Sequence, residues 1–200
     1  MGVELKLKII GIYGSPRVNG NSSILLDEAL KGAVDNGAAI KTIRVCDLDI
    51  SGCTECAGCD TTGNCIIKDD MQEIYPQLQD ADVILLASSI FFYGFPSQLK
   101  AFIDRSQAEW NRRKLTKDPE GLKTYDSGKG YLLAVGATWG KNLFHGVKLT
   151  ARYFFDALDI SYQSGLFYPK IEEKGEIRNY PEILNESYEF GKKIVDDQSS

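Results

Sequence analysis

The chain has 200 residues, of which 43% are hydrophobic and 26% charged, and 23 basic against 28 acidic side chains give a net charge of -5. This balance predicts one soluble globular domain over residues 1–200 with a substantial buried core. The acidic excess argues against nucleic acid and against a polybasic membrane-surface protein, because both kinds of recognition usually need a basic face. We therefore expect no nucleic-acid partner and no membrane partner.

The N-terminus and the longest apolar run give no sign of export. Charged and apolar residues are interleaved over residues 1–10, whereas a signal peptide needs an uninterrupted apolar region. The longest apolar run, residues 83–95, contains two serines and is too short to cross a bilayer. A cytoplasmic location is the expectation.

Strands and helices are predicted to alternate along the chain. The β-branched run at 5–15 indicates a buried strand, and 22–36 has helical apolar spacing that stops at Gly37. Asp69 and Asp70 are expected to open a short helix, because acids are favoured in a first turn. In chain order, further strands are predicted at 39–46, 82–88, 131–136 and 160–167, further helices at 98–113, 143–158 and 181–195, and a polar loop at 114–129.

This alternation predicts a three-layer α/β domain with a parallel sheet. In such folds, ligands bind beyond the carboxyl ends of the strands, near the point where the strand order reverses. The unusual residues of this sequence follow the first four predicted strands. We therefore expect one functional edge of the sheet.

The loop at 14–23, GSPRVNGNSS, joins the first strand to a helix and suits a phosphate group. A helix N-terminus offers free N–H groups and a positive dipole end, while the side chains add hydroxyls and a guanidinium. The loop matches neither the P-loop nor the dinucleotide fingerprint, so a monophosphate fits best. The alternative is an ordinary loop in which Asn21 or Ser22 only caps the helix.

Two further loops have aromatic residues where polar ones are usual. Residues 89–96 read SIFFYGFP, and residues 136–140 read GATWG. Such loops suit a planar ring that needs apolar contact on its face and hydrogen bonds at its edge. The alternative is that these aromatics are core residues beneath a lid. A phosphate together with a flat ring indicates FMN.

Four of the five cysteines lie within thirteen residues, at Cys53, Cys56, Cys59 and Cys65. In a reducing compartment such crowding usually indicates metal or redox chemistry rather than disulfides. Thiolates select iron-sulfur clusters or zinc, and free or labile thiols are the third alternative. Cys46, on a predicted strand, is expected to act as a small hydrophobic residue.

Three segments together, 14–23, 53–71 and 89–105, resemble the flavodoxin-like NADPH-dependent FMN reductases, and within them the iron-sulfur flavoproteins. The resemblance covers most of the chain and implies a flavodoxin-like fold with strand order 2-1-3-4-5 and a cysteine loop at about 52–68 after strand 2. It implies FMN and a 4Fe-4S cluster as cofactors, and it suggests a homo-oligomer, dimer or tetramer. Ser89 stands where many relatives have proline.

The resemblance also assigns residues to each cofactor. It implies that Cys53, Cys56, Cys59 and Cys65 hold the cluster. The FMN residues are Ser15, Arg17, Asn21, Ser22 and Ser23 for the phosphate, and Ser89, Ile90, Phe91, Phe92, Tyr93, Gly94, Gly136, Thr138 and Trp139 for the ring and ribityl chain.

The predicted function is electron transfer between FMN and the cluster, with NAD(P)H or a redox protein as partner and no catalytic side chain. Two alternatives stay open: a cluster-free NAD(P)H-dependent FMN or quinone reductase, and a zinc-stapled binding module. His145 is a weak candidate proton donor, more typical of a helix surface or a core. Asp104 and Arg105 are predicted to form an ion pair, and the basic run at 112–117 is either a docking surface or a solvated loop.

Overall fold

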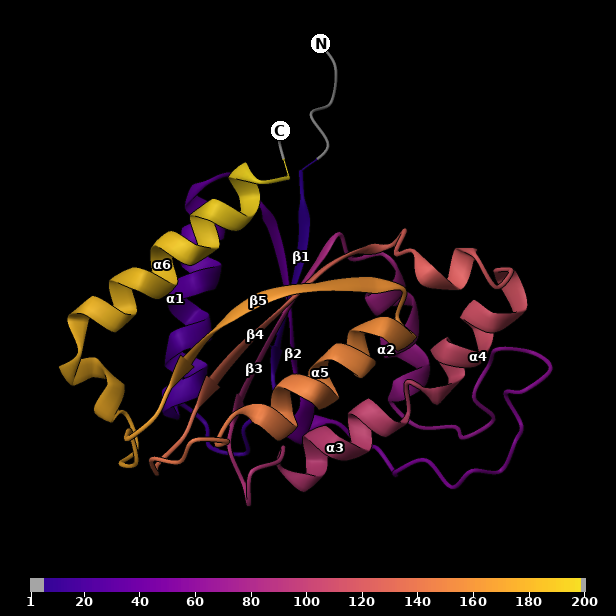
Figure 1. The fold of residues 1–200 in the computed structure, drawn as a ribbon, viewed down its shortest axis with the longest axis horizontal. Helices are drawn as coiled ribbons and strands as arrows, with labels where there is room; N and C mark the ends of the chain where they lie inside the picture. Colours follow the sequence, from indigo (N-terminus) through magenta and orange to yellow (C-terminus); the bar gives the residue numbers. More distant parts are fainter. Residues whose placement is uncertain (1–5, 199–200) are drawn as a thin grey trace, which may run out of the picture.

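The computed structural model describes residues 6–198, and these form a five-stranded parallel sheet (Figure 1). The order β2-β1-β3-β4-β5 confirms the predicted topology, and every neighbouring pair is parallel. The central strand is buried along nearly its whole length, as expected where helices cover both faces. The strands are β1 (Lys8–Tyr13), β2 (Ala39–Arg44), β3 (Val83–Ser89), β4 (Gly128–Val135) and β5 (Ile160–Tyr168).

Helices cover both faces of this sheet and complete the predicted three layers. They are α1 (Asn21–Asp35), α2 (Met71–Gln79), α3 (Ser97–Asp104), α4 (Gln107–Thr116), α5 (His145–Ala157) and α6 (Pro181–Asp196). Figure 1 shows α1 and α6 on one side of the sheet and α2, α3 and α5 on the other. Alternate residues of β1 point to opposite sides, so Ile10 and Ile12 pack in one hydrophobic cluster and Ile9 and Tyr13 in the other.

Glycines let α1 and α6 pack unusually close together. A Cβ on Gly191 would lie 1.8 Å from the carbonyl oxygen of Ala29, and one on Gly32 would lie 2.0 Å from that of Tyr188. The buried Ser187 hydroxyl also donates to the carbonyl of Leu25 at 2.6 Å. This contact anchors α1, whose N-terminus faces the predicted phosphate loop.

The predicted helix at 98–113 is wrong as a single element, because the chain forms α3 and α4 with a break at Arg105 and Ser106. At the break, the Tyr75 hydroxyl donates to the Arg105 carbonyl at 3.0 Å. Apolar spacing continues across the break, so periodicity alone does not reveal it. The start of the predicted first strand, Leu5, lies outside the described residues, while Gly14 and Ser15 lie beyond the end of β1.

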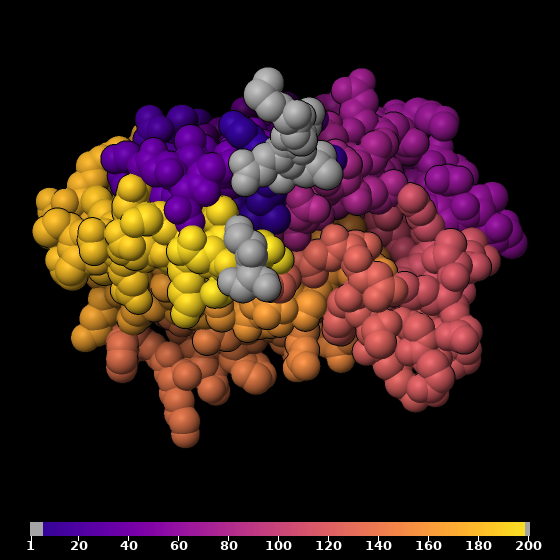
Figure 2. Space-filling view, turned by 90° about the horizontal axis from the view of Figure 1, so that it is seen from above, coloured from indigo at the N-terminus to yellow at the C-terminus, as the bar shows by residue number. Residues whose placement is uncertain are grey.

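The polar segment between α4 and β4 lies on the far side of the molecule from α6. Figure 2 shows this segment in salmon and α6 in yellow on opposite sides. The prediction of a loop at 114–129 holds for its middle, whereas its first residues extend α4 and its last two begin β4. Among the described helices, none is both long enough and apolar enough to pass through a bilayer.

Candidate functional site

The loop after β1 reaches the N-terminus of α1, where Ser15, Ser22 and Ser23 are buried. Gly20 is the N-cap residue, and no side chain of the described residues caps this helix. The interpretation of Asn21 or Ser22 as an ordinary cap is therefore wrong, and the first-turn N–H groups have no side-chain cap. The Ser23 hydroxyl is buried without a hydrogen-bond partner among the described residues. These features suit an anion at the helix N-terminus.

A cavity of about 150 Å³ joins this loop to the ends of β3 and β4. The Ser89 hydroxyl donates to the Ser15 hydroxyl at 3.2 Å, which links the two loops. Arg17 is exposed, and its guanidinium donates to the carbonyl of Glu172 at 3.4 Å. The structure thus brings four of the predicted phosphate residues beside the aromatic loop, whereas Ser23 does not line this cavity. The lining residues are Ser15, Arg17, Gly20, Asn21, Ser22, Ser89, Ile90, Phe91, Val135, Ala137, Ile171 and Glu172.

Asn21 has a different role from the other residues of this loop. Its Nδ2 donates to the carbonyl of Glu173 at 2.8 Å, and its Oδ1 accepts from the backbone N–H of Ile177 at 3.2 Å. The side chain therefore ties the start of α1 to the 3-10 turn Glu176–Asn179.

The aromatic loop after β3 forms a tight turn with its side chains outside the core. Phe91 and Gly94 exchange two backbone hydrogen bonds, at 3.0 and 2.8 Å. Between them Phe92 and Tyr93 have φ of 49° and 62°, a conformation that costs about 1–3 kcal/mol for each residue. Phe92 is fully exposed, and Phe91 and Tyr93 are about half exposed. The interpretation of these three residues as core beneath a lid is therefore wrong.

The loop after β4 lies against this aromatic turn. A Cβ on Gly140 would be 2.5 Å from the Tyr93 hydroxyl, so the two loops are in contact. Gly136 is fixed by backbone bonds to Tyr168 and Ile171, at 2.9 and 3.2 Å. Thr138 and Trp139 are exposed, and the Trp139 ring lies 5.0 Å from the Lys170 ammonium. We call the two loops together the aromatic wall; of its aromatic side chains, Phe91 lines the serine-lined cavity.

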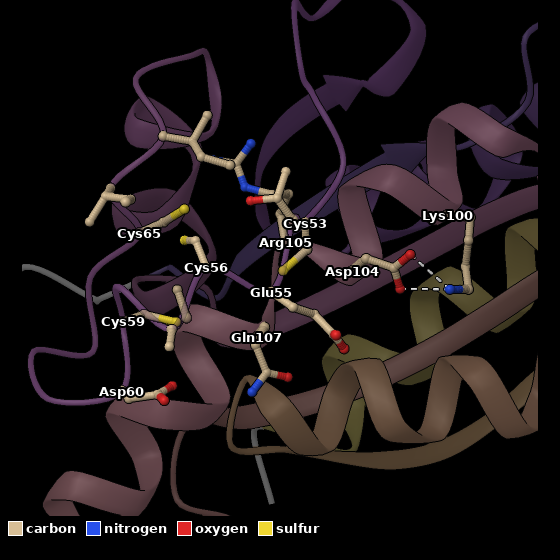
Figure 3. A pocket seen from close by; sticks show the side chains of 15 residues that line it. Cys53, Glu55, Cys56, Cys59, Asp60, Cys65, Lys100, Asp104, Arg105 and Gln107 are labelled. Atoms are coloured by element: carbon tan, nitrogen blue, oxygen red, sulfur yellow. Dashed lines mark hydrogen bonds and ion pairs between the residues drawn. The ribbon is translucent and has the colours of Figure 1, made fainter.

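The four clustered cysteines line one cavity of about 740 Å³ (Figure 3). The loop curves around this cavity because Glu55 and Ala57, on either side of Cys56, both have positive φ, 51° and 58°. All of these thiols are free of disulfides. No group of three or more His, Cys, Asp or Glu within residues 6–198 is spaced to hold a single metal ion. The four thiols around this cavity are soft ligands of the kind that binds iron-sulfur clusters or zinc.

A buried ion pair closes the base of the cysteine loop. The Arg105 side chain is fully buried, and its Nη1 and Nη2 both donate to Asp69. Nη1 also donates to the carbonyl of Ser51 at 2.9 Å, and Asp69 accepts from the Ser51 N–H at 3.2 Å. The two ends of the loop are thereby joined. Asp69 also accepts from the N–H of Met71, which orders the start of α2.

Charge balance stabilises this pair. Burial raises the pKa of Asp69, but hydrogen bonds from Arg105 and from Ser51 outweigh burial and hold that pKa below its ordinary value. Burial lowers the pKa of Arg105, but the hydrogen bond to Asp69, together with the charges of Asp69, Tyr75 and Cys65, outweighs burial and raises that pKa above its ordinary value. Both groups are therefore charged at neutral pH.

The structure gives Arg105 a different partner from the predicted one, and it places Arg105 at the cysteine cavity, where the sequence analysis did not expect it. The predicted Asp104–Arg105 pair is wrong, since Asp104 pairs with Lys100 on the exposed face of α3 at 2.6 Å. Successive helical residues point in different directions, whereas residues four apart share a face. Asn111 was also missed: its Nδ2 lies 3.1 Å from the Cys59 sulfur. No sequence motif marks either residue.

The remaining polar candidates have structural or surface positions. Arg113 is buried and pairs with Asp156 and Asp159, and Lys117 pairs with Asp159 and Asp126. At these two residues the basic run at 112–117 is therefore neither a free docking surface nor a solvated loop. Their side chains form ion pairs with carboxylates of α5, of the turn after α5 and of the loop before β4. His145 is exposed at the start of α5, and Cys46 is half-buried outside the cysteine cavity.

Residues 7–139, which include both the serine loop and the cysteine loop, match the family model described as NADPH-dependent FMN reductase. The chain belongs to this family. A curated relative in Archaeoglobus fulgidus, an iron-sulfur flavoprotein, is 33% identical over 141 residues. The match covers 67% of this chain and 64% of the relative, so the chain spans less than two thirds of that protein.

Solved structures support the fold. A flavone reductase has a TM-score of 0.69 at 21% identity, with 95% of this chain and 62% of that one covered. A flavodoxin from the domain Archaea has a TM-score of 0.57 at 13% identity, with 97% and 100% covered. At such identities the likeness concerns architecture only, and it confirms the flavodoxin-like topology of this family member.

Proposed function

We propose that this protein is an iron-sulfur flavoprotein that binds FMN and one 4Fe-4S cluster and transfers electrons between them. The observation that carries the proposal is the cavity of about 740 Å³ lined by all four clustered thiols. The cysteine loop follows β2 in the chain, so this cavity lies at the same carboxyl-end edge of the sheet as the serine-lined cavity. Family membership supports the flavin, and the curated relative supports the cluster.

The FMN phosphate is assigned to the loop between β1 and α1. Ser15, Ser22 and Ser23 supply hydroxyls, the first-turn N–H groups supply backbone donors, and Arg17 supplies charge from the exposed side. Asn21 contributes its backbone and holds the helix start in place. The unpartnered Ser23 hydroxyl is a feature that an anion at this helix would account for.

The flavin ring is assigned to the aromatic wall. Ser89, Ile90 and Gly94 are assigned to the ring edge. The N–H groups of Ile90 and Gly94 are already bonded to Val135 and Phe91, so these two residues would offer carbonyl oxygens, and the aromatic side chains would offer apolar surface that excludes water from the ring. The exposed, strained turn at Phe92 and Tyr93 is the kind of segment that a ligand stabilises. The remaining contacts are assigned to Phe91, Gly136, Thr138 and Trp139.

The cluster is assigned to Cys53, Cys56, Cys59 and Cys65 as thiolate ligands. Four thiolates around one large cavity suit a cluster, and the similarity to a curated iron-sulfur flavoprotein favours a cluster over zinc. When bound, FMN exchanges one or two electrons and the cluster exchanges one. The residues described here bind, orient and shield these groups, and none is needed as an acid or a base.

The partners follow from this chemistry. We infer that NAD(P)H or a redox protein exchanges electrons with the flavin, and that the chain acts as a homo-oligomer, with exposed Phe92 and Trp139 available to a second copy. Residues 1–200 are inferred to work as a single FMN-binding domain. We infer a cytoplasmic location, because a reducing compartment keeps the thiolate ligands of a cluster from forming disulfides.

Composition analysis of protein purified without oxygen tests this function. Iron, acid-labile sulfide, zinc and FMN are measured per chain. About four irons and four sulfides with one FMN are expected. Flavin without metal would favour the cluster-free reductase and direct assays to nicotinamides and quinones. Zinc with no flavin would favour the binding module.

A further inference from the structure

Two buried nitrogen donors lie against the cysteine loop but belong to α4 and to the residue that follows α3. One is Asn111 on α4, which is only 1% exposed. Its Nδ2 lies 3.1 Å from the Cys59 sulfur and 2.8 Å from Asp60 Oδ1, so its two N–H groups point at two acceptors. A thiolate and a carboxylate can only accept hydrogen bonds, which fixes the amide with its NH2 group toward them.

The second donor is the Nε–H of Arg105. The Nη atoms of this side chain are already bonded to Asp69 and to the Ser51 carbonyl. Nε is buried, has no hydrogen-bond partner among the described residues, and belongs to a side chain that lines the cavity with the four cysteines (Figure 3). A buried N–H without a partner is costly, so such a group usually marks a missing acceptor.

We propose that Arg105 Nε and Asn111 Nδ2 donate hydrogen bonds to sulfur atoms of the cluster and raise its reduction potential. The inference rests on the proposed function, because it requires the cluster. Uptake of one electron makes the cluster more negative. Donors and a positive guanidinium beside the cluster therefore stabilise the reduced form more than the oxidised one.

Each residue also has a structural contact that does not depend on the cluster. Asn111 uses one N–H for its bond to Asp60, and its second N–H points to Cys59. Arg105 uses its Nη atoms for the bonds to Asp69, and its Nε has no partner among the described residues. A purely structural role predicts an effect on stability. Donation to the cluster predicts an effect on the midpoint potential of a protein that has kept its cluster.

The test is anaerobic redox titration of the full chain with both cofactors loaded. Dithionite supplies the single electron, and the electron paramagnetic resonance signal of the reduced cluster reports the midpoint. Asn111→Leu removes the amide at similar volume. Its matched control is Asn64→Leu, because Asn64 is exposed in the cysteine loop and donates to the Thr62 carbonyl rather than to a sulfur.

Asn111→Leu is expected to keep its iron and sulfide while the equilibrium constant for cluster reduction falls about tenfold, which is 59 mV for a one-electron couple. The control and the flavin midpoint should not move. If Asn111→Leu loses the cluster, Arg105→Lys provides the reading, since lysine keeps the charge near Asp69 but lacks Nε–H. A full cluster with unchanged midpoints in every variant that keeps it would overturn the inference. Wild-type protein without iron and sulfide would instead overturn the proposed function.

Discussion

The Arg105–Asp69 pair makes the sharpest prediction for stability. Asp69→Asn removes the negative charge that faces a guanidinium whose side chain is 0% exposed. Because breaking a buried pair leaves its partner uncompensated, the free energy of unfolding should fall by about 3–5 kcal/mol. Asp104→Asn is the matched control on α3. Its pair with Lys100 has side chains 51% and 42% exposed, so the loss should be about 0.3–0.5 kcal/mol.

Urea unfolding of the cofactor-free chain measures both losses, because bound cofactors would add their own binding energy. With a slope of about 2 kcal/mol per M, Asp69→Asn should lower the midpoint by about 1.5–2.5 M, and Asp104→Asn should leave it almost unchanged. Equal shifts in the two variants would refute the assignment of Asp69 as the partner of Arg105. A larger shift of the urea midpoint in Asp104→Asn than in Asp69→Asn would support the Asp104–Arg105 pair expected from the sequence.

Four further results are expected. The pKa of Asp69 is lowered in the folded state, so its ionisation adds to the free energy of unfolding. This stabilisation is complete above the unfolded pKa of roughly 3.9 and is lost as pH falls through the folded pKa. Unfolding measured over a series of acid pH values should show this loss in the wild type and not in Asp69→Asn. Gly191→Ala should lower the free energy of unfolding by about 1–3 kcal/mol or more in thermal and urea unfolding, because a Cβ would lie 1.8 Å from the carbonyl oxygen of Ala29, and an unchanged value would contradict the close helix contact. Arg17→Ala should weaken FMN binding in a fluorescence titration about tenfold and leave cluster content intact, and unchanged affinity would remove Arg17 from the phosphate site. Cys59→Ala should lose iron and sulfide while FMN stays bound, and full iron content would sink its assignment as a ligand.

The sheet and most of the site could be predicted because they follow from local patterns. The apolar run of β3 and the alternation of strands with helices are enough for the three-layer architecture, and the strand order came from the family resemblance. The positions of the serine, aromatic and cysteine loops follow from where strands end. The break between α3 and α4 could not be predicted, because Tyr75, which bonds the Arg105 carbonyl there, lies thirty residues away along the chain.

The sequence also did not reveal which acidic residue pairs with which basic residue. Arg105 finds Asp69 across 36 residues and Arg113 finds Asp156 across 43, whereas sequence reasoning could only pair neighbours. Such contacts form when the topology brings loops and helix ends together, and no motif marks them. Asn21 shows the same effect. Its place in the serine loop is visible in the sequence, but its bonds to the segment before α6 are not.

Helix α3 connects the two halves of the proposed site. It begins directly after the aromatic loop and ends at Asp104, next to Arg105, which fastens the cysteine loop, and its eight residues span about 12 Å. Leu99 and Phe102 are completely buried, so the helix is fixed to the core between its two functional ends. A side chain at Gly14 would meet Leu99, which places the serine loop against the same helix. The serine, aromatic and cysteine loops are therefore all attached to one helix that is fixed to the core, although they come from three separate parts of the sequence.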